Sequence, residues 1–245
     1  MMFSLKPSET YEPGQSLDFG DYTLRLRVNA RARRISLRID NKTGDAIVTA
    51  PRPKHLKDAV EFARTRHDWI LQTRRGQERP QPFAPGTVIS IKGHAVTLAE
   101  RKGVIAPKAE QAEDGSWLLV TSGEGATYAK RIERYLRQLA AKTLQAETDT
   151  YAARLGVTGV KVSLNDPKGR WGSCTPSRKT IRYSWRIVMA PPQVRQYLVA
   201  HEVSHLRHPD HSPAFWNCVT EVFGGAYKPH RDWLKKRGHE LFRFQ

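Results

Sequence analysis

The sequence predicts an α+β protein with a β-rich N-terminal part that carries one helix, followed by a largely helical C-terminal part. Residues 22–28 (YTLRLRV) and 34–39 (RISLRI) alternate apolar and polar side chains, as half-buried strands do. Residues 54–75 instead repeat apolar side chains at spacings near three and four, which is typical of an amphipathic helix. Residues 201–205 (HEVSH) place two histidines four positions apart in a second helical stretch.

The N-terminal elements follow from simple local signals. Residues 1–20 are rich in Pro, Gly, Ser and Asp and predict an irregular lead-in. After the two alternating strands, AIVTA at 46–50 predicts a third strand, which the PRP at 51–53 ends. The next segment, 54–75, predicts one helix with a basic outer face. Its apolar face carries Val60, Ala63, His67, Ile70 and Leu71.

The middle of the chain predicts more strands and then a boundary. Residues 87–100 (TVISIKGHAVTLAE) predict a hairpin that turns at Lys92–Gly93, and SWLLVT at 116–121 predicts another strand. The polar segment 106–116 between them predicts a loop. SGEGA at 122–126 is the best candidate for a boundary between two domains. We therefore expect a basic, β-rich subdomain at 21–125 and a second domain at 126–245.

The second domain should begin with a long helix over about 128–155. VKVSLND at 160–166 then predicts a strand, and RWGSC at 170–174 and TIRYSWRIV at 180–188 predict two more.

Two further helices surround the histidines. Proline is tolerated in a first helical turn, so APP at 190–192 predicts a helix start, and Pro209 should end that helix near Arg207. Ser212–Pro213 predicts the next helix start and Gly224–Gly225 its end. A last helix is expected at 231–236.

Composition favours a globular protein with an anionic partner. The chain has 245 residues, a net charge of +17 and two cysteines, which are too few for a disulfide framework. Neither a signal peptide nor a membrane-spanning segment is recognisable, so we expect a cytoplasmic monomer without a membrane partner. The charge favours nucleic acid, a nucleotide or another anion, although basic side chains spread over every face would give the same sum.

Arginines are densest in the predicted N-terminal strands. Several would share one face of a sheet, where they could bind the phosphates of a nucleic acid. The alternative is that this face is exposed to solvent and binds nothing. The arginines are Arg25, Arg27, Arg31, Arg33, Arg34 and Arg38.

The H-E-x-x-H pattern predicts a metal site. On a helix, His201 and His205 stack one turn apart, so both imidazoles can reach one ion at about 2.0–2.1 Å. Glu202 lies about a quarter-turn around the helix, where it can reach a water on the metal rather than the metal itself. We expect Glu202 to take a proton from that water and pass it to a leaving group.

A third ligand has four candidates. They are His208, Asp210, His211 and Glu221. His208 would point along the helix axis, away from an ion between the first two histidines. A chain that turns at Pro209 favours His211 instead, and leaves His208 and Asp210 with supporting roles.

These stretches resemble the YgjP-like metal-dependent hydrolases, relatives of the SprT and WLM zinc peptidases. The resemblance rests on RWGSC at 170–174, LVAHEVSHLRHPDHSPAFW at 198–216 and the residues between them. It implies a zincin-like, minigluzincin-type C-terminal domain. It also implies one zinc ion on His201, His205 and His211, with Glu202 as general base.

The substrate stays open at this stage. The resemblance to the zinc peptidases implies a peptide substrate. The positive charge of the chain instead favours a nucleoside triphosphate that is hydrolysed at a phosphoanhydride bond. A nucleic-acid-binding protein with a structural metal is the third hypothesis, which an intact Glu202 disfavours.

The RWGSC stretch is the best candidate for substrate contacts. Arg170 could bind an anion through its planar guanidinium, and Trp171 and Ser173 could line a cleft. Equally, Trp171 could anchor the core and Gly172 could allow a close backbone approach. We expect Cys174 to be neither a nucleophile nor a metal ligand.

Overall fold

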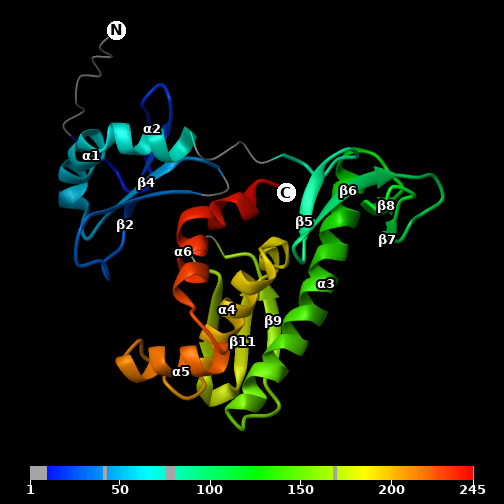
Figure 1. Cartoon of the computed structure of the whole chain (residues 1–245). Coiled ribbons are helices and arrows are strands. Elements are labelled where there is room, and N and C mark those ends of the chain that lie inside the picture. The colour runs from blue at the N-terminus through cyan, green and yellow to red at the C-terminus, as the bar shows by residue number, and fades with distance from the viewer. Residues whose placement is uncertain (1–9, 41–42, 76–80, 168–169, 245) are drawn as a thin grey trace. The chain divides into compact units, whose positions relative to one another are not determined.

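The computed structural model describes residues 10–40, 43–75, 81–167 and 170–244 (Figure 1). It is a mixed α+β structure of small sheets and helices, as the sequence predicted. The chain forms two compact units, residues 1–80 and 81–245.

The first unit is a four-stranded sheet with two helices. The strands are β1 (Ser16–Asp18), β2 (Thr23–Val28), β3 (Ser36–Ile39) and β4 (Ala46–Ala50), in the order β1-β2-β4-β3. β2 and β4 are parallel, and the other two pairs are antiparallel. The core contains Leu24, Leu26 and Val48 from the sheet and Leu56, Val60 and Ile70 from the helical segment.

Two predictions about this unit were wrong. The lead-in contains the short strand β1. The single helix expected over 54–75 is a 3-10 turn, η1 (Pro53–His55), and two helices, α1 (Leu56–Thr65) and α2 (His67–Arg75). The break falls at Arg66, whose φ of −107° and ψ of 14° leave the helical region. Its N–H is donated to the carbonyl oxygens of Ala63 and Arg64, three and two residues back, instead of four residues back as in an α-helix.

The second unit opens with another four-stranded sheet. It contains β5 (Val88–Ile91), β6 (His94–Glu100), β7 (Lys108–Gln111) and β8 (Trp117–Thr121), in the order β5-β6-β8-β7. The hairpin turns at Lys92–Gly93 as predicted, with positive φ at both residues. β7 replaces part of the expected loop. It has little apolar character and forms because its backbone pairs with β8.

The sheet of β5–β8 packs with the C-terminal elements of the second unit. Its buried side chains, among them Ile89, Leu98 and Leu119, belong to the same core as the long helix α3 (Gly125–Arg154) and the helix that carries His201. The division at residues 80 and 81 therefore differs from the boundary expected at 125 and 126. SGEGA is the connection into α3, not a division between the two units.

A smaller sheet and three helices complete the second unit. The sheet has the order β10-β11-β9, from β9 (Lys161–Asn165), β10 (Gly172–Thr175) and β11 (Thr180–Ser184). Short 3-10 turns are η2 (Pro176–Arg178), η3 (Trp185–Met189) and η4 (Gly238–Phe242). The helices are α4 (Pro192–Ser204), α5 (Pro213–Phe223) and α6 (Lys228–Arg237). Figure 1 shows α4, β9 and β11 alongside the C-terminal half of α3.

The expected strand over 180–188 ends early. Ser184 is its last residue, and WRIVM forms η3 instead. All five of these side chains are buried, so the segment enters the core as a turn on α3 rather than continuing the sheet.

Buried ion pairs fix the elements around the site. On α4, Arg195 is 4% exposed and bonds to both carboxylate oxygens of Glu147 on α3, at 2.8–3.1 Å. In η3, Arg186 pairs with Asp166 at 2.9 Å and also donates to the carbonyl oxygen of Leu241 at 3.3 Å. Removing one partner of such a pair leaves a buried charge uncompensated, so these contacts hold their segments in place.

No helix among the described residues combines the length and apolar character needed to cross a bilayer.

Candidate metal centre and active site

The site begins at the C-terminal end of α4. This helix presents Val194 and Leu198 to the core, two turns and one turn before His201 respectively. It ends at Ser204, slightly earlier than predicted, because Leu206 and Arg207 donate to carbonyl oxygens only three residues back. His205 is the C-cap and keeps helical dihedral angles, φ −65° and ψ −17°, so it still stacks below His201.

The chain then turns and begins α5. Asp210 accepts the backbone N–H of Ser212 at 3.5 Å, and the Ser212 hydroxyl accepts the N–H of Phe215 at 3.4 Å. Pro213 occupies the first turn, as the sequence predicted. This capped start places His211 immediately before α5, on the open side of the other two histidines.

Three imidazoles converge as a result. One ring nitrogen from each of His201, His205 and His211 lies within 4.8 Å of the others. Among the described residues, His208, Asp210 and Glu221 stand outside this group. All three rings pack against Phe215, with centroid distances of 4.5–5.0 Å. Phe215 is fully buried and therefore acts as a rigid support for the histidine triad.

One pair of the triad already has the ligand spacing of a tetrahedral metal ion. The Nε2 atoms of His201 and His211 lie 3.3 Å apart. Two ligands at about 2.0–2.1 Å from a tetrahedral zinc ion would be separated by about 3.3–3.4 Å. The Nδ1 of His205 lies 3.0 Å from the backbone carbonyl oxygen of His208. A proton on Nδ1 donated to that oxygen leaves Nε2 free as a ligand.

The electrostatics of the triad agree with ligation. Burial, with smaller contributions from His205 and His211, lowers the pKa of His201 to about 3. Burial also lowers the pKa of His205. Both imidazoles are therefore neutral at neutral pH, which is the form that binds metals.

Glu202 lies beside the triad and is almost inaccessible. It is 4% exposed, and its Oε2 atom is buried with no hydrogen-bond partner in the described part of the chain. Burial raises its pKa to about 8, and the charge of Arg170 partly opposes this rise. Burial alone therefore favours the neutral carboxyl group at pH 7, whereas a cation bound nearby would favour the carboxylate.

Comparison with known proteins identifies the family. The model of the YgjP-like family, described as a metallopeptidase domain, matches residues 33–237. The chain belongs to the YgjP-like family. The resemblance inferred from RWGSC and the histidine stretch is thereby confirmed, and the chain is a metal-dependent peptidase by family.

One solved structure has a partial likeness to this YgjP-like chain. It is the crystal structure of the metallopeptidase zymogen abylysin from Pyrococcus abyssi, with 24% identity and a TM-score of 0.36. The match covers 39% of the YgjP-like chain and 95% of the abylysin chain. The search of curated proteins gave no match.

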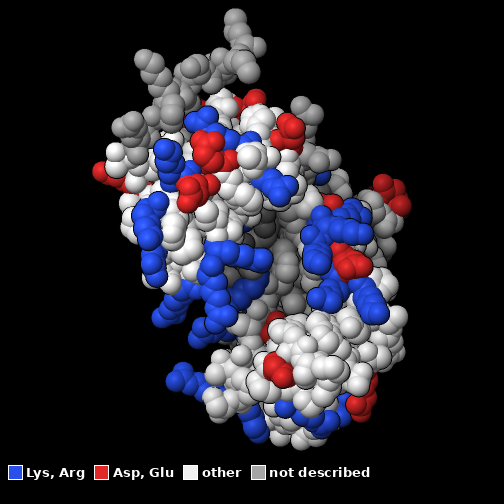
Figure 2. Space-filling view, turned by 90° about the vertical axis from the view of Figure 1, so that its left-hand side faces the viewer, with Lys and Arg blue, Asp and Glu red and all other residues white. Residues whose placement is uncertain are grey.

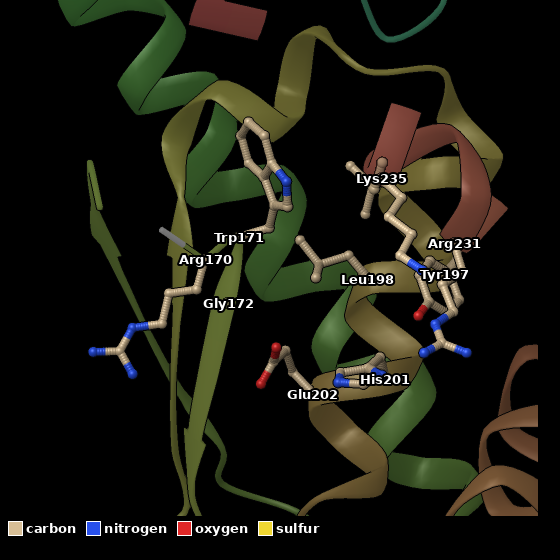
Figure 3. Close-up of a pocket in the computed structure, with 10 residues that line it drawn as sticks. Arg170, Trp171, Gly172, Tyr197, Leu198, His201, Glu202, Arg231 and Lys235 are labelled. Atoms are coloured by element: carbon tan, nitrogen blue, oxygen red, sulfur yellow. The ribbon is translucent and has the colours of Figure 1, made fainter. Parts of the chain in front are cut away.

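A pocket of about 380 Å³ opens beside the histidine triad of the YgjP-like domain. Figure 3 shows His201 and Glu202 projecting from α4 toward the strand that carries Gly172. Trp171 and Leu198 form an apolar side. Arg231 and Lys235, both from α6, approach from the opposite side (Figure 3).

The three predicted substrate-binding residues differ in their positions. Arg170 and Trp171 line the pocket, although the guanidinium of Arg170 points away from its interior in Figure 3. Trp171 also packs on Phe242, with ring centroids 5.2 Å apart, so it combines a core role with a pocket role. Ser173 does not line the pocket, because side chains alternate along β10 and Gly172 takes the inward position.

Cys174 is not equipped for nucleophilic chemistry. Burial, assisted by the negative charge of Glu202, raises its pKa to about 12. Its thiol stays protonated at neutral pH, and its sulfur is outside the histidine triad.

Sequence reasoning missed the α6 side of the pocket. Arg231 stacks on Trp216, with its guanidinium carbon 4.5 Å from the ring centroid, and Trp216 stacks in turn on Tyr227. No motif marks these residues. They join the site only because α6 packs back against α4, a long-range contact that the local pattern of α6 does not encode.

The backbone of Gly172 fixes the position of Glu202. A Cβ atom built at residue 172 would lie 2.5 Å from Glu202 Oε1, closer than real Cβ contacts. The expectation of a close backbone approach at Gly172 is therefore confirmed.

We predict that Gly172→Ala displaces the Glu202 carboxylate and lowers kcat by about 10²-fold, the scale expected for a misplaced catalytic group. Metal content should stay that of the wild type, since no histidine moves. Hydrolysis of a casein-like protein and metal analysis measure the two effects. Gly225→Ala is the matched control, because nothing lies within 4 Å of its added Cβ. Equal activity of the two variants would contradict this role of Gly172.

Proposed function

We propose that this chain is a zinc-dependent peptidase of the zincin type, in which Glu202 is the general base. The observation that carries the proposal is the convergence of His201, His205 and His211 beside a buried, unpaired carboxylate. Three neutral imidazoles leave one position of a tetrahedral ion for water or substrate, which distinguishes a catalytic site from a closed structural one. The order of long helix, small sheet and metal helix supports the zincin type.

The chemistry divides between the ion and the chain. Bound zinc would supply Lewis acidity, lowering the pKa of water toward about 7 and polarising a carbonyl group. Glu202 would accept a proton from the attacking water and deliver it to the leaving nitrogen. The C–N bond would then break after the C–O bond has formed, and the amine would leave neutral.

The edge strand beside the site supports a peptide substrate. β10 is the outermost strand of its sheet, pairing with β11 on one side only. Gly172, at its start, faces Glu202. An extended peptide could add to this edge through backbone hydrogen bonds, which would bring a peptide bond toward His201 and Glu202.

The α6 side of the pocket favours an acidic group near the cleaved bond. Arg231 and Lys235 contribute two positive charges there, opposite the apolar side formed by Trp171 and Leu198. We propose that an Asp or Glu side chain of the substrate occupies this position, while apolar residues occupy the other side.

The ligand set has a direct test. We predict that His211→Ala loses most of the roughly one zinc ion that each wild-type chain should hold. His208→Ala should keep it, because only the backbone carbonyl of His208 supports His205. Metal analysis after dialysis measures both. Zinc loss in the His208 variant with retention in the His211 variant would exclude the proposed triad.

The role of Glu202 predicts a separable effect. Glu202→Gln should keep zinc, since Glu202 is not a ligand, and should lower kcat by about 10²–10⁴-fold. Wild type and variant should be assayed in parallel on a casein-like protein and on nucleoside triphosphates. Loss of protein hydrolysis alone supports a peptidase. Glu202-dependent hydrolysis of nucleoside triphosphates alone would replace the peptidase with a nucleotide hydrolase, and zinc loss would make Glu202 a ligand.

The pocket charge predicts substrate preference. Lys235→Gln should raise KM about 3- to 5-fold for a peptide with Asp or Glu beside the cleaved bond, which corresponds to one partly screened charge pair. KM for the matching Asn or Gln peptide should not change. Lys236→Gln is the control, because Lys236 has the same charge and is not among the pocket-lining residues. Equal effects of the two variants would show that only net charge matters.

A further inference from the structure

The topology of the first unit gathers several of its arginines at one edge of the sheet. β2 and β4 run parallel with Val28 opposite Ala50, so their carboxyl ends reach the same edge of the sheet. β3 is antiparallel to β4 with Ser36 opposite Thr49, so it begins at that edge. The connections 29–35 and 51–55 therefore leave the sheet side by side.

This edge, called the basic edge below, concentrates positive charge. It carries six exposed cationic residues, namely Arg27, Arg31, Arg33, Arg34, Arg52 and Lys54. The acidic residues of the strands lie at the opposite edge, where Ile39 pairs with Ala46 and Asp40 and Asp45 adjoin them. Arg25 is satisfied there by Asp45 at 2.7 Å. Two acidic residues lie on the basic side. Glu12 comes just before Gly14, whose N–H bonds to the carbonyl oxygen of Leu26, and Asp58 lies in the first turn of α1.

The backbone holds these side chains on an ordered support. Asn29 donates its N–H to the carbonyl oxygen of Ala50 at 3.0 Å, which ties the first connection to the end of β4. The Asn29 side chain accepts the N–H of Arg31 at 3.0 Å. His55 closes a turn onto the carbonyl oxygen of Arg52 at 3.0 Å. Little ordering of the chain is then needed when a ligand binds.

We infer that the basic edge binds the phosphate backbone of nucleic acid. Two strand spacings separate β2 from β3, about 10 Å, and a duplex presents about one phosphate charge per 1.7 Å of its axis. Several phosphates thus lie within reach of the six cations. Five of the six are arginines, whose planar guanidinium groups bind phosphate oxygens in pairs.

The surroundings disfavour a membrane surface. Between residues 27 and 54, the described part of the chain exposes no large apolar side chain that could insert among lipids. Exposed aromatic rings for base stacking are absent from the same described stretch, so the contact would read phosphates rather than sequence. Figure 2 shows Lys and Arg side chains gathered in patches on the face that it presents, in keeping with the net charge of +17.

The test compares two variants of equal net charge. The first replaces Arg31, Arg33, Arg34 and Arg52 by Gln. The control replaces Lys102, Lys130, Arg134 and Lys142 by Gln, four exposed cations of the second unit. Fluorescence anisotropy with a short labelled DNA duplex of mixed sequence, at about 50 to 200 mM salt, gives the dissociation constant and its salt dependence. Melting curves check that both variants fold.

We predict that the basic-edge variant binds the duplex at least about 10-fold more weakly than wild type. The slope of the logarithm of its binding constant against the logarithm of the salt concentration should also be shallower by about two or more. The control should change affinity less than about 3-fold. Equal weakening of both variants would overturn the proposal in favour of a diffuse charge effect. A basic-edge variant that keeps duplex binding, but loses binding to vesicles containing phosphatidylserine, would assign the edge to a membrane surface instead.

Discussion

The packing of three imidazoles on one buried ring is the interaction on which this site depends. Phe215 reaches all three because Ser212 caps α5 and so fixes where the helix begins. On the other side, α4 is anchored to α3 by the buried pair of Arg195 and Glu147. A metal site needs its ligands held close to productive geometry before the ion arrives, and the helix cap, ring and ion pair provide that support here.

The same packing encloses Glu202. Only glycine at position 172 leaves room for its carboxylate, and the close approach of β10 removes water from it. Burial without a hydrogen-bond partner destabilises the charged form, which is why the pKa of Glu202 rises. Support for the three histidines and the raised pKa of Glu202 therefore come from neighbouring elements of one unit, whereas the proposed phosphate contacts lie on the other.

Local signals made part of this structure predictable. The helical spacing of His201 and His205, the Ser212–Pro213 start of α5 and the Lys92–Gly93 turn each depend on a few adjacent residues. Features set by distant contacts were not predictable. The strand β7 and the packing of β5–β8 with α3 depend on partners elsewhere along the chain. The pocket charges on α6 and the grouping of arginines at the basic edge required the topology as well.

Anomalous diffraction at the zinc edge from zinc-loaded crystals tests the central claim most directly, because it locates the ion without an assay or a known substrate. Our account predicts one strong peak about 2.0–2.1 Å from a ring nitrogen of His201, His205 and His211, with the Glu202 carboxylate outside the coordination shell. A peak at another place, or an ion coordinated by Glu202, would contradict it.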